Sequence, residues 1–167
     1  MSNVETNRAR TLRRILVCLF VVCGYMLSTT FAYAYIQTSE GAEPELISMT
    51  ALNLAFGSMN ADHPVYRNTF FGVLYMVIPL IGFFFMFFDK KSNLKNLVGI
   101  CCGVIGCLAI ALPIGFNDEL APGVGALTSV LVYVFITMLS AISVFVKLED
   151  NAKMRKEGSV PLLDGKL

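Results

Sequence analysis

The chain has 167 residues, of which 56% are hydrophobic and only 15% are charged, with a net charge of +1 and a mean hydropathy of +0.67. A soluble domain usually carries about 25% charged residues. Long uncharged runs use up most of the chain, so the composition excludes a separate soluble domain. The five cysteines all fall inside these apolar runs, which excludes an external domain held together by disulfides.

Residues 1–14 are polar, contain four arginines, and are predicted to form a cytoplasmic N-terminal segment. Residues 15–36, ILVCLFVVCGYMLSTTFAYAYI, carry no charge and are long enough to cross a bilayer as a first helix. The basic start, apolar centre and small residues up to Ala34 also fit a signal peptide that is cleaved there. We favour an uncleaved anchor because apolar and aromatic residues continue past the site. Removal of residues 1–34 is the alternative.

Residues 37–68 are predicted to form an outer loop. Within this loop, residues 44–56 begin with a proline and are followed by a glycine, as short helices often are. Leu46, Met49, Leu52 and Phe56 recur at roughly helical spacing, although polar residues partly alternate there as in a strand. We therefore expect a short amphipathic helix that lies in the outer membrane interface.

Two further uncharged runs, residues 69–88 and 97–116, flank the charged stretch DKKSNLKN at residues 89–96. Each run has the length of a spanning helix, so together they predict a transmembrane hairpin with a lysine-containing cytoplasmic loop. Pro79 lies in the middle of the first of these runs and is expected to kink its helix.

The rest of the chain completes a predicted four-helix bundle. Residues 117–123 are expected to form a short outer turn, residues 124–146 a fourth span, and residues 147–167 a cytoplasmic tail. The predicted fold class is thus all-α, a transmembrane four-helix bundle with a short interfacial helix in the first outer loop.

The basic residues set the orientation. Four lie in the N-terminal segment, three in the central loop and five in the tail, which makes twelve of the 13, whereas only Arg67 lies in an outer segment. Cytoplasmic loops carry an excess of Lys and Arg. We therefore predict a multi-pass protein of the plasma membrane with both termini in the cytoplasm.

No residue pattern indicates catalysis, a cofactor or a metal. The predicted spans contain no ionisable Asp, Glu, Lys, Arg or His, on which proton relays and ion-coupled carriers depend. Cys101 and Cys102 are adjacent and do not form the Cys-x-x-Cys pair of membrane thiol oxidoreductases, so we interpret the cysteines as apolar fillers. His63 beside Asp62 lacks the further ligands that a metal site needs, and we interpret it as a loop residue.

A stripe of small residues, each four positions after the last, runs along the predicted third span: Gly99, Gly103, Cys107, Ala111 and Gly115. Small residues let helix backbones approach closely in lipid, so the stripe is predicted to be a helix-packing interface. We favour packing against another helix of the same chain. The alternative is a homo-oligomer or the helix of a membrane protein partner.

Hydroxyl side chains follow one face of the predicted fourth span: Ser129, Tyr133, Thr137 and Ser140, with Ser143 nearby. Such a face either lines a polar path or, more commonly, holds helices together through hydrogen bonds.

The outer motif TALNLAFG, residues 50–57, followed by a span with a central proline, resembles a pattern in uncharacterised small four-helix membrane proteins of Gram-positive bacteria. The order of the segments is also similar to that of claudin-like tetraspan proteins, but the chain has no Trp and no cysteine pair in its first outer loop. The resemblance implies architecture and no activity.

From these features we predict a non-enzymatic integral membrane protein, either structural or an accessory subunit. The alternative is an oligomeric channel or transporter component. The expected partners are the lipid bilayer and either a second copy or another membrane protein, with no nucleic acid.

The orientation is testable by labelling. A membrane-impermeant thiol reagent should label a His63→Cys variant in intact cells and a Ser92→Cys variant only after lysis, each relative to the parent chain. Labelling of the Ser92→Cys variant in intact cells would contradict the predicted topology.

Overall fold

The structure is a computed structural model, and it describes residues 3–36, 43, 45–56, 69–88, 94–116 and 120–157. The elements, in chain order, are α1 (Asn3–Met26), β1 (Ala32–Ile36), β2 (Glu45–Met49), α2 (Ala51–Phe56), α3 (Thr69–Phe88), α4 (Leu94–Gly115), β3 (Leu120–Pro122) and α5 (Val124–Glu157). The fold is mostly helical (81%), but it also contains a small sheet, so the predicted all-α class needs correction.

Three of the helices are long and apolar enough to cross a membrane: Phe70–Phe88 of α3, Leu94–Gly115 of α4 and Val124–Val146 of α5. They coincide with the second, third and fourth predicted spans. Beyond Val146, α5 continues as one helix to Glu157, so part of the predicted tail is helical.

The first predicted span is wrong after residue 26, because α1 ends at Met26 and residues 32–36 form a strand. Hydroxyl side chains end the helix: Ser28 Oγ donates to the carbonyl of Tyr25 and Thr29 Oγ1 to that of Met26, each at 2.7 Å. Such local hydrogen bonds compete with helix continuation. The apolar part of α1 is then only about 12 residues, or roughly 18 Å, which is shorter than the roughly 30 Å hydrocarbon layer.

The predicted helix over residues 44–56 is likewise only half correct. Residues 45–49 form β2, and the helix α2 begins at Ala51. Thr50 caps it, since its Oγ1 accepts a hydrogen bond from the Asn53 N–H at 3.2 Å. Residues 45–49, ELISM, do not alternate strictly, but β1 offers them a partner strand, and pairing with it outweighs the helical spacing.

The sheet joins two parts of the chain that are far apart in sequence. β1 lies in the middle and pairs antiparallel with β2, where Ala32 faces Met49, and with β3, where Ala34 faces Leu120. β3 falls in the predicted outer turn between the third and fourth spans, so a strand replaces part of that turn.

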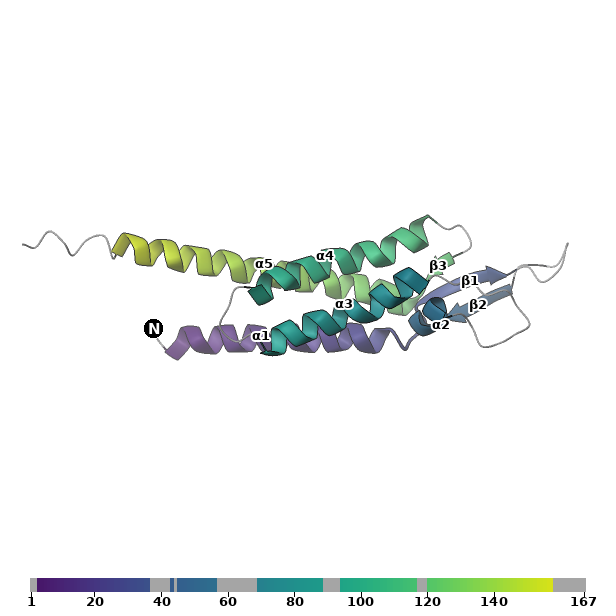
Figure 1. Cartoon of the computed structure of the whole chain (residues 1–167), viewed down its shortest axis with the longest axis horizontal. Helices are drawn as coiled ribbons and strands as arrows, with labels where there is room; N and C mark the ends of the chain where they lie inside the picture. Colours follow the sequence, from purple (N-terminus) through teal and green to yellow (C-terminus); the bar gives the residue numbers. More distant parts are fainter. Residues whose placement is uncertain are drawn as a thin grey trace, which may run out of the picture.

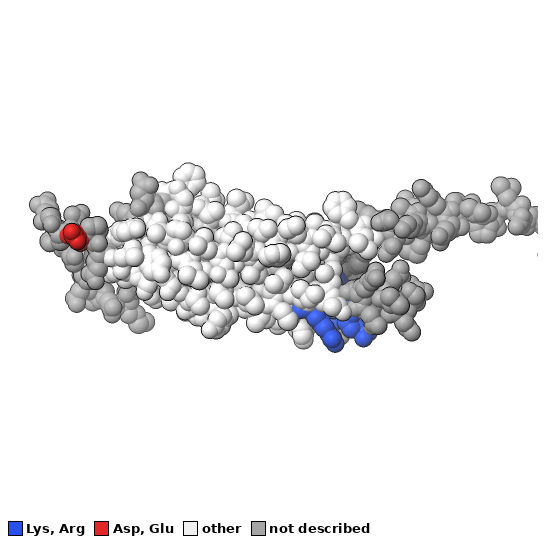
Figure 2. All heavy atoms as spheres, turned by 180° about the vertical axis from the view of Figure 1, so that it is seen from behind, with Lys and Arg blue, Asp and Glu red and all other residues white. Residues whose placement is uncertain are grey.

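The helices lie side by side along one long axis, and the sheet and α2 gather at one end (Figure 1). We call this the sheet end. At the opposite end, which we call the basic end, Figure 2 shows the Lys and Arg side chains, whereas the acidic side chain lies at the sheet end. The described charged side chains are Arg10, Arg13, Arg14, Lys95 and Glu43.

The buried positions of two helices alternate in steps of three and four residues. One such series in α3 is Gly72, Tyr75, Pro79, Gly82 and Met86, and one in α4 is Asn96, Gly99, Gly103, Gly106, Ile110 and Pro113. Ile78, Cys102 and Ala109 are buried beside these series. This is the heptad spacing of helices that pack as in coiled coils. Glycines at these positions allow close contact: a Cβ on Gly82 would overlap the Phe20 ring of α1, and one on Gly72 would overlap Ala55 of α2.

Although α1 is not one of the three long apolar helices, it is part of the bundle. It packs against α3 and α5, and its Leu16, Phe20 and Cys23 are each only 1% exposed. Cleavage after Ala34 would remove these core side chains and cut the central strand of the sheet. The anchor interpretation keeps the core complete.

Backbone hydrogen bonds close the junction where α1, the sheet and α5 meet. The N–H of Gly123 donates to the Phe31 carbonyl at 2.9 Å, and the N–H of Gly125 donates to the Thr30 carbonyl at 2.8 Å. On the other side, the N–H of Ala51 donates to the Leu27 carbonyl at 3.2 Å. Three carbonyls of the turn that follows α1 are thus paired within the chain.

From the packing at this junction we expect a substitution to alanine to have opposite effects on stability at two glycines. In Gly125→Ala, the new Cβ would lie 2.8 Å from the Met26 carbonyl oxygen and 3.1 Å from that of Thr30, so we expect a loss of roughly 1–3 kcal/mol. In Gly24→Ala, the Cβ meets nothing within 4 Å, so the better helix former should leave stability unchanged or raise it by up to about 1 kcal/mol. Thermal unfolding in detergent measures both, and equal melting temperatures would contradict the junction.

Candidate functional site: the hydroxyl face of α5

The hydroxyl face of α5, defined as Ser129, Tyr133, Thr137, Ser140 and Ser143, points into the bundle. Ser140 is 0% exposed, Ser129 1% and Tyr133 3%, whereas the outward-facing side of the same helix carries large apolar residues such as Phe135. The most polar face of a predicted span is therefore covered by the other helices of the chain.

Glycines of α4 cover the hydroxyl face. A Cβ on Gly99 would overlap Ser140 Oγ and lie 2.6 Å from Met86 Cε, and one on Gly103 would overlap Thr137 Oγ1 and lie 2.9 Å from the Tyr133 carbonyl oxygen. One helical turn further on, a Cβ on Gly106 would lie 2.7 to 2.8 Å from the Tyr133 ring. Here α4 and α5 approach so closely that only glycine fits on the α4 side.

Only part of the predicted small-residue stripe lies at this contact. Gly99 and Gly103 face α5, and Cys107 is half-buried with its Sγ 3.7 Å from the Val130 carbonyl oxygen. Ala111 and Gly115 are exposed, and a Cβ on Gly115 would meet nothing within 4 Å, so these two residues do not lie at the contact with α5. Their assignment to a helix-packing interface stays a prediction. A step of four residues turns about 400°, so the stripe drifts by about 40° per step and leaves the interface.

The spacing of four also missed Gly106, which lies at the contact. The heptad steps of three and four residues, from Gly99 through Gly103 and Gly106 to Ile110, would have found it. That signal is present in the sequence.

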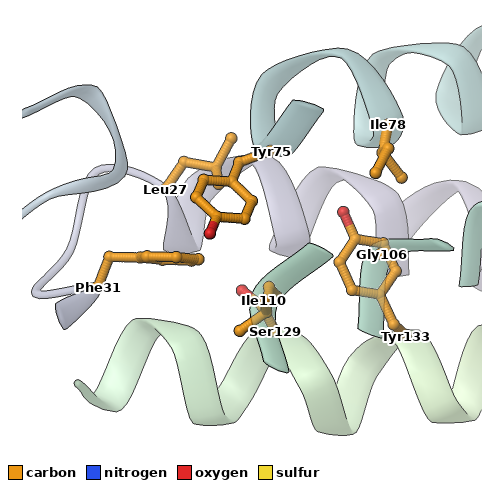
Figure 3. Close-up of a pocket in the computed structure, with 8 residues that line it drawn as sticks. All are labelled: Leu27, Phe31, Tyr75, Ile78, Gly106, Ile110, Ser129 and Tyr133. Carbon is orange, nitrogen blue, oxygen red and sulfur yellow. The ribbon is translucent and has the colours of Figure 1, made fainter. Parts of the chain in front are cut away.

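Tyr133 is the side chain at which the helices meet. Its hydroxyl lies against the Cys23 thiol of α1, and its ring covers Gly106 of α4. It also lies beside Ile78 of α3 (Figure 3). One residue of α5 therefore contacts α1 and α4 and lines a pocket together with a residue of α3.

A small pocket in the bundle is lined in part by three hydroxyl-bearing side chains, Tyr75, Ser129 and Tyr133. Its walls are Leu27, Phe31, Tyr75, Ile78, Gly106, Ile110, Ser129 and Tyr133 (Figure 3). The Tyr75 hydroxyl donates a hydrogen bond to the Ala109 carbonyl at 3.1 Å. The Tyr75 ring packs on that of Phe31, with the ring centroids 4.8 Å apart. The volume open to the centre of a water molecule is about 0 Å³. A water molecule needs at least about 10–15 Å³ on this measure, so the pocket is dry.

The hydroxyl groups divide into two kinds. Thr137 Oγ1 donates to the Tyr133 carbonyl and Ser143 Oγ to the Leu139 carbonyl, both at 2.9 Å and both one turn back on the same helix. Ser129 Oγ and Ser140 Oγ are buried without a hydrogen-bond partner. Chemically, the face can hold helices together, and its two unpartnered hydroxyls could accept or donate a hydrogen bond if water or a polar group reached them.

The other residues considered from the sequence are dispersed. All five cysteines are free, with Cys18 and Cys101 exposed and Cys23 and Cys102 buried. Pro79 is buried inside α3, and its kink stays a prediction. His63 lies outside the described residues. Within the described part of the chain, no three His, Cys, Asp or Glu side chains are placed to hold a metal ion.

Comparison with known proteins finds no relative of this chain: no family model matches it, and no curated protein or solved structure matches it significantly. The resemblances drawn from the sequence stay predictions. The function has to be argued from the bundle itself.

The helix contact can be tested with the same substitution at two glycines of α4. Gly103→Leu should destabilise the bundle by roughly 1–3 kcal/mol, because the side chain would separate α4 from α5. Gly115→Leu should cost much less, since its Cβ projects into open space. The measurement is thermal unfolding in detergent. Equal losses for the two variants would mean that the stripe acts as one interface along its full length.

Proposed function

We propose that the chain is a non-enzymatic integral membrane protein, a structural or accessory subunit that holds a fixed bundle in the bilayer and presents a small folded surface beside it. The observation that carries the proposal is the closed hydroxyl face of α5. Its polar groups pack against α4 glycines and a dry pocket rather than against a water-filled path.

The proposed place of the protein is the plasma membrane, with the basic end in the cytoplasm. Arg10, Arg13, Arg14 and Lys95 lie at that end, and twelve of the 13 basic residues fall in segments that the topology puts inside. The bilayer is the first partner, because large apolar side chains cover the outside of α3, α4 and α5. Examples are Phe84, Leu108 and Leu131, each more than half exposed.

An oligomeric channel or transporter component is the second candidate, and one observation favours it. Ser129 and Ser140 hold buried hydroxyls without partners, and such groups cost roughly 1–3 kcal/mol each when they stay unsatisfied. A state in which α4 and α5 separate would let water reach both.

Water access at Ser140 separates the two candidates. In membranes, a small charged methanethiosulfonate reagent should add to a Ser140→Cys variant no more groups than it adds to the parent chain, as counted by mass spectrometry. A Glu43→Cys variant, changed at an exposed position of the sheet end, should gain one group and serves as the positive control. Reaction of the Ser140→Cys variant would reject the closed bundle in favour of a water-filled path.

A further inference from the structure

The two faces of the small sheet differ in what covers them. Ala32, Ala34, Met49 and Leu120 alternate onto one face and are almost fully buried. The opposite face, which we call the tyrosine face, consists of Tyr33, Tyr35, Leu46, Ser48 and Ala121, and all of these are exposed or half-buried. The register places Tyr35 directly opposite Leu46 and Tyr33 opposite both Ser48 and Ala121.

The tyrosine face is unusually apolar for an uncovered sheet face. Antiparallel sheets with one buried face normally carry polar residues on the other. Here Tyr35 is 47% exposed and Leu46 is 50% exposed, and the pair lies side by side. An exposed aromatic and aliphatic patch beyond the end of the helices is typical of a surface that binds another protein.

The sheet also offers an edge for binding. The strand order is β2-β1-β3, so among the described strands β2 has a neighbour on one side only. An edge strand presents unpaired backbone N–H and C=O groups, to which an extended peptide can add as a further strand. With five residues, β2 is long enough for several such hydrogen bonds, whereas β3 has three and ends in Pro122.

Charge indicates what kind of strand fits. Glu43 and Glu45 stand at the start of β2, and Asp118 and Glu119 directly precede β3. With Glu40 and Asp62, the two outer segments carry six acidic residues in sequence and one basic residue, Arg67, which gives a net charge of −5. Two such ends repel each other, which disfavours a second copy as the occupant.

We propose that β2 is a docking edge for an extended segment of a partner protein that alternates apolar and basic residues. The apolar side chains pack beside Leu46 and Tyr35 on the tyrosine face, and the basic side chains offset the carboxylates that flank β2. The proposal names a partner class for the accessory role proposed above and rests on that role. The binding surface itself does not depend on whether the bundle is closed.

The probe is a fluorescein-labelled peptide of sequence RVRVRVR, with EVEVEVE as its charge-reversed counterpart. The full-length protein is placed in nanodiscs of neutral phosphatidylcholine, so that both ends are accessible and empty nanodiscs correct for binding to lipid. Fluorescence anisotropy should show that the basic peptide binds, that the acidic one does not, and that affinity falls as salt is raised. Equal binding of the two peptides, or of neither, would overturn the proposal.

Two matched variants locate the site. Leu46→Thr keeps a good strand former and should weaken binding about tenfold, the scale of a side chain at the centre of an interface. Leu52→Thr changes a leucine of α2 that is equally exposed (49%) at the same end of the molecule, and should leave binding within about twofold. If both variants weaken binding alike, the peptide does not recognise the tyrosine face.

Ser48→Lys gives a second test that removes no apolar contact. The added positive charge on the tyrosine face should repel the basic peptide and weaken its binding at low salt, with the melting temperature unchanged. Unchanged binding would contradict docking at β2.

Light scattering tests whether a second copy occupies the tyrosine face instead. A dimer of the parent chain that is lost in Leu46→Thr would show this and would also overturn the proposal. If the basic peptide does not bind the parent chain and the Ser140→Cys variant does not react, the docking edge is rejected while the closed bundle is retained.

Discussion

The backbone at the end of α1 imposes the main constraint on this fold. α1 stops at Met26, while α3 and α4 have the full length of a span, so the turn that follows lies beside other helices. Irregular backbone at membrane depth is tolerated only where protein buries it and pairs its polar groups. The chain meets this condition with its own segments: the start of α5 binds Thr30 and Phe31, and the start of α2 binds Leu27. The sheet exists because these segments have to converge there.

Close approach of backbones supplies the remaining cohesion. In lipid the hydrophobic effect gives little drive for helix association, so van der Waals contact and interhelical hydrogen bonds have to supply it. Gly99 and Gly103 bring the α4 backbone onto Ser140 and Thr137, at positions where a Cβ would overlap the hydroxyl oxygens. The Cα–H groups of these glycines therefore point at those oxygens, a recurring contact at helix interfaces that partly offsets the lack of a conventional partner at Ser140.

The sequence predicted the three long spans because uncharged runs of about 20 residues leave few alternatives. The prediction failed at residues 27–36 and 44–50. An apolar run such as Ala32–Ile36 fits a helix as well as a strand, and only the presence of a partner strand decides between them. The hydroxyl face was visible as a pattern in α5, but whether Ser140 meets water or Gly99 depends on how α4 is rotated. The assumed repeat of four residues placed Gly115 at the contact with α5. The heptad steps of three and four residues would have placed Gly106 there.

A short path of packed side chains and hydrogen bonds joins the sheet to the bundle. β1 carries Tyr35 on its exposed face, and four residues earlier the same chain buries Phe31 against the Tyr75 ring. Tyr75 in turn binds the Ala109 carbonyl of α4, and Gly123 and Gly125 fix the start of α5 to the same turn. No flexible linker separates the sheet from the helices along this path. The turn from which β1 emerges is therefore hydrogen-bonded to the start of α5 and packed on Tyr75 of α3, so β1 is held directly against the helices.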